Sequence, residues 1–588
     1  MTLSLGARIG GFSLFPIFVL LLAAAAQPPD SPPHQGAGLI PADRLADWRP
    51  GVTVGVPGGI PMDRTHQIDV TQPPYGADRT GATDAQPAIM RAIAAAKDKG
   101  IVFLPAGTYR INTAITIGKS RITLRGAGPE RTRLVTYNSG RGGAIDLNFL
   151  AMRNGFWGDT PRLAITGSPK RGATILSADP SGLARYPNGG VGQICQLALK
   201  NDPALPVLAP GGGDYLRKQV TRIVAKTATT ITISPALLFD LPEALAPNLL
   251  PSDGQIELVG VEDLSIDATN SATRHSPLVM ANSYACWVTN VAIRNVPNWH
   301  FLMLDSLQCE IRHCLLAKRT KPMGPDGGGL MFSGCAFFLV EDNVLLEAFP
   351  AIEVTGTCGS VFAYNYSDDR AVQGGILGAA INTNHGAHNS FNLYEGNYAP
   401  RLQSDGYHGS ASHDTVFRNW LHGTSRFADQ FWVCVNLNRF TRAYSIVGNV
   451  LGRRGSAWDY DNAGGSFGYE RHLIYALGLP NMGNGGHTGK AQPSAGRPWA
   501  DWGKTPGAGG FQELDLDVPA TTLRKGNFNF HDQAVPATEA LGAAQLPASL
   551  YRSGKPAWFG ALAWPPFGPD VKFEPNKIPA QVRAEAGR

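Results

Sequence analysis

One short stretch of the chain concentrates side chains that can move protons. The segment from His385 to Asn419 holds four of the 13 histidines, with tyrosines and carboxylates interspersed among them. An unperturbed imidazole has a pKa of about 6.5 and therefore accepts or releases a proton near neutral pH. These residue types favour acid–base chemistry, and the alternative is that they are the polar outside of a repetitive fold.

The composition is that of a large, folded, turn-rich protein. The chain has 588 residues, of which 16% are charged, and it contains 69 glycines and 44 prolines. Hydrophobic residues make up 43%, which excludes a disordered chain and, with the many turn residues, favours a β architecture. The net charge of +5 permits an acidic ligand, and no run of Lys and Arg is dense enough to predict a nucleic-acid surface.

The N-terminus has the pattern of an export signal. Arg8 precedes an apolar run from Phe12 to Ala26, and three alanines before Gln27 fit a cleavage site. The run is shorter than the roughly 20 residues of a membrane span. We therefore expect a signal peptide at 1–26, a secreted or periplasmic protein with no membrane span after cleavage, and a linker or N-terminal edge at 27–66.

A repeat runs through the middle of the chain, which must position any site there. An Asn followed by an apolar or aromatic residue recurs at 290, 343, 365, 397, 419 and 449, and Asp263 and His313 fill the same slot. The short intervals, such as 343 to 365 and 397 to 419, define a unit of about 22 residues, and the longer intervals are that unit with an inserted loop. Such a period predicts a β-solenoid, in which each coil stacks on the one before.

The repeated Asn predicts a turn ladder. Asn tolerates the left-handed conformation, and Asn side chains on successive coils can hydrogen-bond to one another. We expect the residue after each Asn to point into the core, which makes Tyr398 and Trp420 core residues. Cys286 and Cys309 are separated by one repeat unit, as are Cys335 and Cys358, which favours stacked buried thiols over disulfides.

The front of the chain predicts a cap for this solenoid. Thr83 and Gln86 fit a capping box at a helix that buries Ile89 and Ile93 on one face and ends at Gly100, and "IVFLPAGTYRI" follows as strand, turn and strand. Together, "GADRTGATDAQPAI" and "VFLPAGTYRI" resemble the N-terminal signature of the pectate-lyase-like superfamily, which includes rhamnogalacturonases and epimerases. The resemblance implies an all-β, right-handed, single-stranded parallel β-helix and a secreted, carbohydrate-active protein whose partner is a polysaccharide. It does not fix the reaction or the oligomeric state.

The remaining boundaries follow from where the Asn repeat is present. We expect the N-terminal cap and first coils at 67–158 and the main coils at 251–455. Residues 159–250 lack the repeat and have strand–turn patterns, which predicts a small inserted β subdomain. Residues 456–588 are expected to form irregular last coils and a C-terminal cap, with Asn527 as one further turn.

In the families that this chain resembles, substrate lies along the sheet of first strands, walled by long loops. The inserted loops here follow His313, Asn365 and Asn419. Stepping back about 12 residues from successive Asn marks gives Glu353, His385, and Tyr407 or His408, one coil (about 4.8 Å) apart. We expect these residues to form a column, with contributions from neighbouring positions and loops that are predicted to bind substrate or assist catalysis: Arg370, Asp368, Asp369, His388, Asp405 and Arg426.

Two reactions suit this set. For β-elimination of a uronate chain, Arg370 or a bound cation such as Ca²⁺ would neutralise the substrate carboxylate, and His385 or His408 would take the C5 proton. Tyr407 or the other histidine would protonate the leaving oxygen. Hydrolysis would instead use two carboxylates across the scissile bond, and the candidates are Glu353, Asp368, Asp369, Asp405 and Asp429.

A third hypothesis is a non-catalytic glycan-binding or cell-envelope solenoid, because known motifs are absent. Asp368-Asp369 precedes "NTNHG", which departs in order and content from the polygalacturonase motifs. The Asp pattern of metal-binding pectate lyases is not evident, and the spacing of His385 and His388 is not a zinc signature, so no metal ligand is assigned. We expect Glu395 to be a solvated turn residue.

Overall fold

The computed structural model describes residues 36–64, 66–137, 150–153, 162–205, 214–271, 276–320, 327–368, 381–405, 408–424, 433–455, 458–462, 472–479, 506–507, 510–511 and 515–587. Residues 35–588 form one compact unit. The expected signal peptide lies outside the described residues, as do Asp369, Arg370, Tyr407, Arg426 and Asp429. None of the helices in the described ranges is long and apolar enough to span a bilayer.

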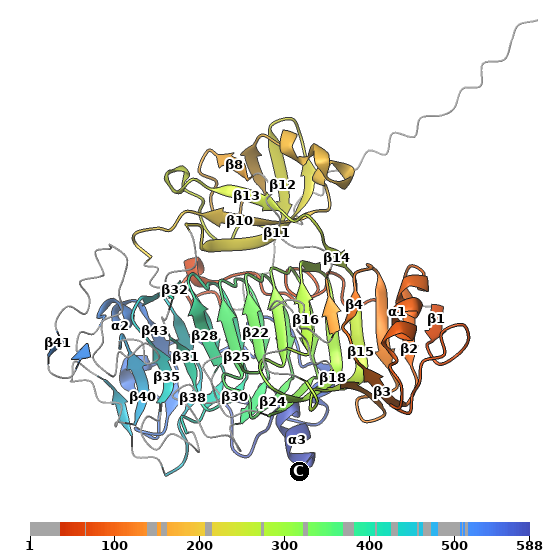
Figure 1. Cartoon of the computed structure of the whole chain (residues 1–588). Helices are drawn as coiled ribbons and strands as arrows, with labels where there is room; N and C mark the ends of the chain where they lie inside the picture. Colours follow the sequence, from red (N-terminus) through yellow and green to blue (C-terminus); the bar gives the residue numbers. More distant parts are fainter. Residues whose placement is uncertain are drawn as a thin grey trace, which may run out of the picture. The chain divides into compact units, whose positions relative to one another are not determined.

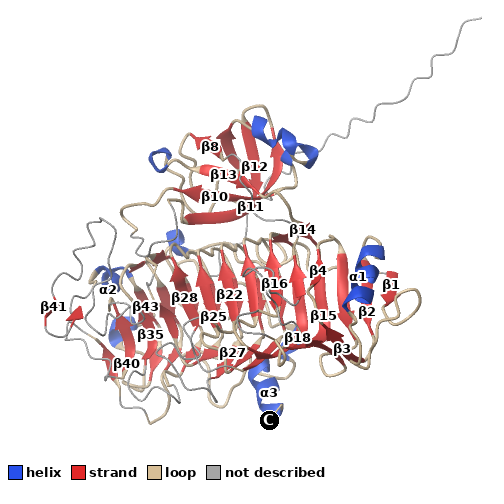
Figure 2. Cartoon of the chain, viewed as in Figure 1, coloured by secondary structure: helices blue, strands red, loops and turns tan. Residues whose placement is uncertain are grey.

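Most strands belong to a right-handed parallel β-helix, which confirms the predicted fold class (Figures 1 and 2). The first sheet has eleven strands, and all of its pairings are parallel. In spatial order they are β4 (Ile115–Ile117), β7 (Leu150–Met152), β16 (Leu278–Ala281), β19 (Phe301–Leu304), β22 (Leu330–Ser333), β25 (Ile352–Thr355), β28 (Ile381–Gly386), β31 (Leu402–Ser404), β35 (Val433–Leu437), β40 (Leu473–Leu477) and β39 (Asp459–Asp461).

The second and third strands of each coil form two further parallel ladders within one 21-stranded sheet. One ladder contains β1 (His66–Asp69), β2 (Gly100–Leu104), β5 (Ile122–Gly126), β15 (Gly260–Asp267), β18 (Trp287–Val296), β20 (Glu310–Arg312), β23 (Leu339–Glu341), β26 (Val361–Ala363), β29 (Leu393–Glu395), β33 (Thr415–Phe417), β37 (Ser445–Val447) and β43 (Leu523–Lys525). The other contains β3 (Gly107–Ile111), β6 (Thr132–Thr136), β21 (Leu315–Arg319), β24 (Val344–Leu346), β27 (Tyr366–Asp368), β30 (Tyr398–Ala399), β34 (Trp420–Leu421), β38 (Val450–Leu451) and β44 (Phe528–Asn529), and it also uses the ends of β15 and β18.

Short pairings outside these ladders complete the strands: β14 (Ile256–Glu257) with β17 (Ser283–Tyr284), β32 (Ala411–Ser412) with β36 (Thr441–Arg442), and β41 (Pro506–Gly507) with β42 (Gly510–Phe511). The interior of the coils is filled by alternate residues of the strands. Aromatic rings pack across coils there, with Phe362 stacked on Tyr394 at 5.1 Å between ring centroids. All seven cysteines are free and buried.

A continuous Asn ladder lines one corner of the coils. The Asn343 amide donates to Asn365 Oδ1 at 2.9 Å, and the same bond recurs from Asn365 to Asn397, Asn397 to Asn419, Asn419 to Asn449 and Asn449 to Asn527. Each Oδ1 also accepts a backbone N–H from the preceding coil. These buried amides are therefore satisfied by their own repetition, and Asn527 is the last rung.

The alignment of the first marks was wrong by one residue. Leu315 pairs with Val344, so His313 aligns with Asp342 and Cys314 with Asn343. His313, Asp342, Tyr364 and Arg418 all have positive φ, between 52° and 57°. The left-handed residue is therefore the one before the ladder Asn, and Asn290 and Asp263 occupy that position as well.

The residue after each ladder Asn does not point into the coil interior, contrary to expectation. Val344, Tyr366 and Val450 belong to a second hydrophobic cluster, and Tyr398 and Trp420 pack against it. Trp420 lies 5.6 Å from Phe567 and 5.5 Å from Phe573, measured between ring centroids. Because strand side chains alternate between faces, the inward Asn places its neighbour outward, where the C-terminal segment covers it.

The capping helix α1 (Gln86–Ala95) starts later than the predicted capping box. Thr83 donates to Asp78 instead, and Asp84 Oδ1 accepts the Gln86 N–H at 3.2 Å. Asp78 holds the hydroxyls of both Thr80 and Thr83, so the turn competes with the cap. The helix still buries Ile89 and Ile93, as predicted.

Residues between β7 and β14 form a closed antiparallel barrel of β8 (Leu163–Thr166), β9 (Ile175–Ala178), β10 (Ile194–Leu199), β11 (Arg217–Lys226), β12 (Thr230–Ser234) and β13 (Asn248–Pro251). The barrel touches the turns that follow the first sheet. Gln196 donates to Asp305 at 3.3 Å, and the Cys358 thiol donates to the Lys218 carbonyl at 3.6 Å.

The two flanking segments run along the solenoid. Trp48 is buried and donates to the Phe391 carbonyl at 2.9 Å. After α2 (Asp517–Thr521) and β44, the C-terminal segment runs back along the side of the coils: Arg418 binds Asp570 at 2.7 Å, and Arg552 binds Glu341 at 2.6 Å. The final helix α3 (Pro579–Ala586) brings Arg583 to Asp342 at 2.6 Å, next to the first rung of the Asn ladder.

Candidate functional site

A row of polar side chains crosses the outer face of the first sheet. Glu353 of β25 is in register with Asn382 of β28, Asn382 with Gln403 of β31, and Gln403 with Asn436 of β35. Their strand neighbours Ile352, Ile381, Leu402 and Val435 belong to the interior cluster, so the row faces outward. All four polar residues are at most 4% exposed.

A break in the pairing of β28 places His385 beside this row. Glu353 pairs with Asn382 and Thr355 pairs with Gly386. The paired stretch of β28 therefore contains more residues than the stretch of β25 beside it. Such irregularities re-aim side chains and are over-represented near active sites. Here the break projects His385 from the end of the strand, with 30% of its side chain exposed.

Asp405 fixes the orientation of His385. Its Oδ2 lies 2.7 Å from His385 Nδ1 and also accepts a hydrogen bond from Asn382 Nδ2 at 2.8 Å. The Asp405 side chain is only 7% exposed, and its backbone carbonyl accepts from Asn438 at 2.9 Å. A carboxylate on Nδ1 makes that nitrogen the donor and leaves Nε2 as the acceptor of the neutral imidazole.

His408 completes the cluster. Its ring meets that of His385 edge to face, with 5.1 Å between centroids. Burial lowers the pKa of His408, the neighbouring His385 lowers it further, and Asp405 partly opposes the shift. The cluster thus holds two imidazoles in contact, and Asp405 orients His385 through its Nδ1.

The other predicted residues are placed differently. The expected column of Glu353, His385 and His408 is wrong in register, because Asn382 and Gln403 occupy the positions next to Glu353. His388, predicted to bind substrate, is 4% exposed and its Nδ1 lies 3.2 Å from Ser410 Oγ. Burial and Arg217 lower the pKa of His388 to about 3, so this histidine is a neutral interior group.

Two carboxyls that the sequence analysis named, Asp368 and Glu395, are not part of the cluster. Asp368 ends β27 in the third strands, where Tyr366 donates to it at 3.1 Å. Glu395 is fully buried and not solvated as expected: it accepts from Tyr364 at 3.1 Å and from the Leu550 N–H at 2.8 Å. Burial raises the pKa of Glu395 to about 7.

Sequence reasoning missed Asn382, Gln403 and Asn436. A fixed step back from each ladder Asn assumed turns of constant length. Asn382 and Gln403, however, lie farther before Asn397 and Asn419 than Glu353 lies before Asn365. The available signal was alternation, because each of these polar residues directly follows an apolar residue in a short strand.

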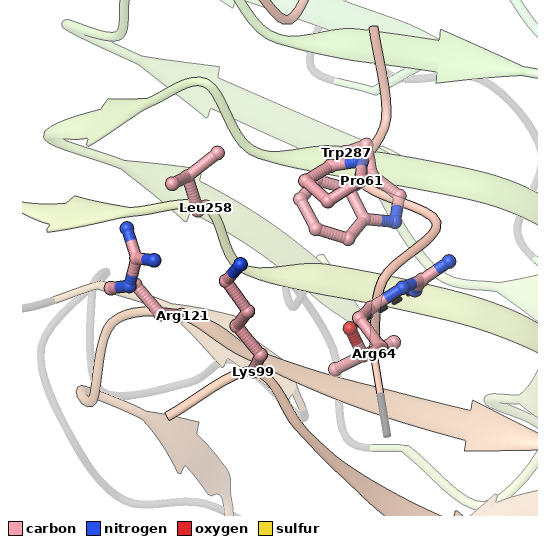
Figure 3. A pocket seen from close by; sticks show the side chains of 7 residues that line it. Pro61, Arg64, Lys99, Arg121, Leu258 and Trp287 are labelled. Carbon is pink, nitrogen blue, oxygen red and sulfur yellow. Dashed lines mark hydrogen bonds between the residues drawn. The ribbon is translucent and has the colours of Figure 1, made fainter. Parts of the chain in front are cut away.

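A separate hollow lies over the first strands of the 21-stranded sheet (Figure 3). Pro61, Trp287 and Leu258 line it together with Arg64, Lys99 and Arg121. Each cation has an acidic partner: Arg64 binds Glu262 at 2.5 Å, Lys99 binds Asp63, and Arg121 binds Asp98 at 2.5 Å. Each cation of the hollow therefore faces a carboxylate, which reduces the positive charge there.

No group of three or more His, Cys, Asp or Glu side chains in the described ranges is arranged to hold a metal ion. The donor sets there therefore give no support for a bound cation, and the expected alternative of Ca²⁺ remains without a candidate ligand set among them.

This chain is similar to a protein family over part of its length and to several solved structures. Residues 70–161 match the family described as "Rhamnogalacturonase A/epimerase, pectate lyase-like". No curated protein matches the sequence. Among solved structures, the tailspike gp49 from Pseudomonas phage LKA1 is 12% identical, with 65% of this chain and 70% of that chain covered and a TM-score of 0.40.

Two other solved structures are similar to this chain at comparable sequence identity and TM-score. The A-module of the mannuronan C-5 epimerase AlgE4 from Azotobacter vinelandii is 13% identical, covers 69% of this chain and 95% of its own, and gives a TM-score of 0.32. PfbA, a surface adhesin of Streptococcus pneumoniae, is 12% identical over 70% and 89%, with a TM-score of 0.36. The family match covers residues 70–161, so it is this N-terminal part of the chain that is similar to the pectate-lyase-like family.

Proposed function

We propose that this protein is a secreted enzyme that cleaves a uronate-containing polysaccharide by β-elimination, with His385 as the base. The carrying observation is the 2.7 Å contact between His385 Nδ1 and Asp405 on a partly exposed histidine. The match to a pectate-lyase-like family supports a polysaccharide as the substrate class.

The chemistry follows from the orientation of the imidazole. With Nδ1–H donated to Asp405, the Nε2 lone pair of His385 accepts the C5 proton of a uronate, and Asp405 stabilises the imidazolium that forms. The C5 electron pair becomes the C4–C5 double bond as the C4–O bond breaks. His408, in ring contact with His385, gives a proton to the leaving oxygen from its protonated form, which its lowered pKa restricts to acidic pH.

Two further roles rest on the sequence. Arg370, or a bound cation, would neutralise the substrate carboxylate, and Tyr407 is the alternative proton donor to His408. Asp369 and Arg426 would contact substrate from the same loops. All four residues lie outside the described ranges, so their roles are proposed from residue type and position in the repeat.

Hydrolysis is the second candidate, and one observation favours it. Glu353 is in register with Asn382, whose amide donates to Asp405, so two carboxylates flank a single amide on neighbouring coils. Glycosidases use such a pair across the scissile bond. Asp405 would then serve as a reacting group and not as the partner of His385.

One assay separates these reactions. The mature protein is incubated with polygalacturonate, rhamnogalacturonan and alginate, and ultraviolet absorbance and reducing ends are followed together. Elimination gives both signals, and hydrolysis gives reducing ends alone. Binding without either signal would identify a glycan-binding solenoid, the third hypothesis. His385→Gln is the control for elimination and Glu353→Gln the control for hydrolysis.

A further inference from the structure

A polar cavity lies between the inserted barrel and the chain segment that follows it, at the first coils of the solenoid. The cavity measures about 410 Å³ and lies between the segment from Tyr186 to Gln193 and the segment from Asp253 to Glu257, with Arg222 of β11 between them. Its volume is within the roughly 300–1,000 Å³ of small-molecule sites, and Tyr186, Pro187 and Val191 give it an apolar side.

The polar groups in this cavity differ in how fully they are used. Arg222 donates to the Gly192 carbonyl at 2.8 Å and binds Glu257 at 3.2 Å, and its guanidinium lies over Tyr284. Within the described ranges the Asp253 side chain has long contacts of 3.4 Å to Tyr186 and Arg185, so its carboxylate retains acceptor capacity.

Asn188 supplies an amide without a partner. Its side chain is exposed and makes no hydrogen bond within the described part of the chain, while its backbone is held in the left-handed region at φ 51°. Gly189, Gly190 and Gly192 also have positive φ, so the loop is shaped before any ligand arrives.

The charge of the cavity selects its ligand. The lining contains one arginine, Arg222, and two carboxylates, Asp253 and Glu257. It therefore has no excess of positive charge that would bind a uronate. Carboxylate, amide and guanidinium groups beside an aromatic ring suit the hydroxyls and apolar face of an uncharged sugar.

Strand β11 links this cavity to the candidate site. Arg222 contributes to the cavity, whereas Arg217 lies close enough to His388 to lower the pKa of that histidine. Extended strand separates the two arginines by about 17 Å. Arg222 binds Glu257 at the cavity, and the Lys218 carbonyl accepts from the Cys358 thiol, so β11 runs from the cavity to the coil of β25, which pairs with the strand β28 that carries His385.

We propose that this cavity is a subsite for an uncharged sugar of the substrate chain and makes the enzyme selective for polymers that mix neutral sugars with uronates. The proposal rests on the proposed function for the identity of the chain as a polysaccharide. The barrel thereby contributes to specificity at a distance from the bond that is broken.

Binding is tested in the full chain carrying His385→Gln, so that no cleavage intervenes. Calorimetry measures its affinity for rhamnogalacturonan, which alternates uronate and neutral sugars, and for polygalacturonate, which contains uronates alone. Asn188→Gly, which suits the positive φ, is combined with Asp253→Asn. Asp214→Asn, at an exposed position outside the cavity, is the matched control.

The double substitution is expected to weaken binding of rhamnogalacturonan at least tenfold and to leave binding of polygalacturonate and the Asp214→Asn form unchanged. Equal binding of rhamnogalacturonan with and without the substitutions, including no binding in either form, overturns the subsite. Equal weakening for both polymers overturns the selectivity for neutral sugars. Failure of the proposed function would instead appear in the absorbance assay on the unmodified enzyme.

Discussion

Two rows of buried polar residues climb the same solenoid, and they are built on opposite rules. The ladder from Asn343 to Asn527 uses one residue type at every rung, and each amide donates to the next Oδ1. The row on the outer face of the first sheet changes from Glu353 to Asn382, Gln403 and Asn436, and its amide at 382 donates sideways to Asp405.

The difference teaches how to separate framework from site in a repetitive fold. An unpaired buried amide is costly, and identical rungs solve that problem by bonding to one another and to the backbone of adjacent coils. A row whose residue type changes from coil to coil cannot satisfy itself by repetition, so its members need partners chosen one by one. In this protein the partner of Asn382 is Asp405, which also contacts His385, and the His385 ring contacts that of His408. These two histidines are side chains that can accept or release protons near neutral pH.

Replacing His385, the proposed base, should give the largest effect. His385→Gln is expected to lower kcat on the cleaved polymer by about 100-fold or more, the typical worth of a positioned general base. The thermal midpoint should change little because His385 is partly exposed. Steady-state kinetics and circular dichroism measure the two effects. Retention of wild-type kcat would remove His385 from the mechanism and leave the outer row without a catalytic partner.

Removing one rung should damage the framework alone. Asn397→Ala strands the Asn365 donors, the Asn419 acceptor and the Phe362 carbonyl, and we expect a loss of about 4 kcal/mol in the free energy of unfolding. Denaturant titration measures the loss, and Asn270→Ala, at an exposed turn residue, is the control. A change under about 1 kcal/mol would contradict the self-satisfied ladder.

A carboxyl inside the framework should reveal itself through pH. Asp414 accepts from Asn392 and Tyr444, and burial raises its pKa to about 8. Because the unfolded carboxyl has a pKa of about 3.9, the stability from its bound proton is present at low pH and is lost as pH rises through 8. Asp414→Asn mimics the protonated form, so the variant should gain stability relative to the parent between pH 5 and pH 9.

The measurement is the denaturant midpoint of both proteins at pH 5, 7 and 9. Glu395, with its pKa raised to about 7, remains in both proteins and gives the same background slope. Parallel curves for the parent and the variant would show that Asp414 is ionised in the folded state.

The second histidine of the same segment should have the smallest effect. His388 is buried, contacts Ser410 and has a pKa of about 3, so it stays neutral across the working range. His388→Gln is expected to change kcat by less than about twofold and to leave the pH–rate profile unchanged, because the profile reports groups that titrate during catalysis. A shifted profile would show that the framework histidine is coupled to His385.

The fold could be predicted from the sequence because a repeat with a fixed period is visible there. The spacing of Asn365, Asn397 and Asn419 predicted coils and a ladder. The site was only partly readable. His385, Asp405 and His408 were named from residue type, but their contact depends on the register break in β28, which no spacing indicates.

The sequence also did not show which way some side chains point or whether they are buried. Tyr398 and Trp420 look like interior residues, yet they face outward because each follows an inward Asn, and a segment near the C-terminus covers them with Phe567 and Phe573. Glu395 has the sequence context of a solvated turn residue, but in the fold it accepts hydrogen bonds from the Leu550 N–H and the Tyr364 hydroxyl. Burial of this kind depends on distant chain segments that local pattern cannot supply.

The sequence by itself indicated the solenoid and the Asn ladder, since both follow from a fixed period. Only the tertiary structure decided which polar residues meet. A coil of variable turn length shifts the register between strands, and the barrel and C-terminal segment bury some residues while leaving His385 partly exposed beside Asp405. Reactivity depends on those contacts, which form between coils and not along them.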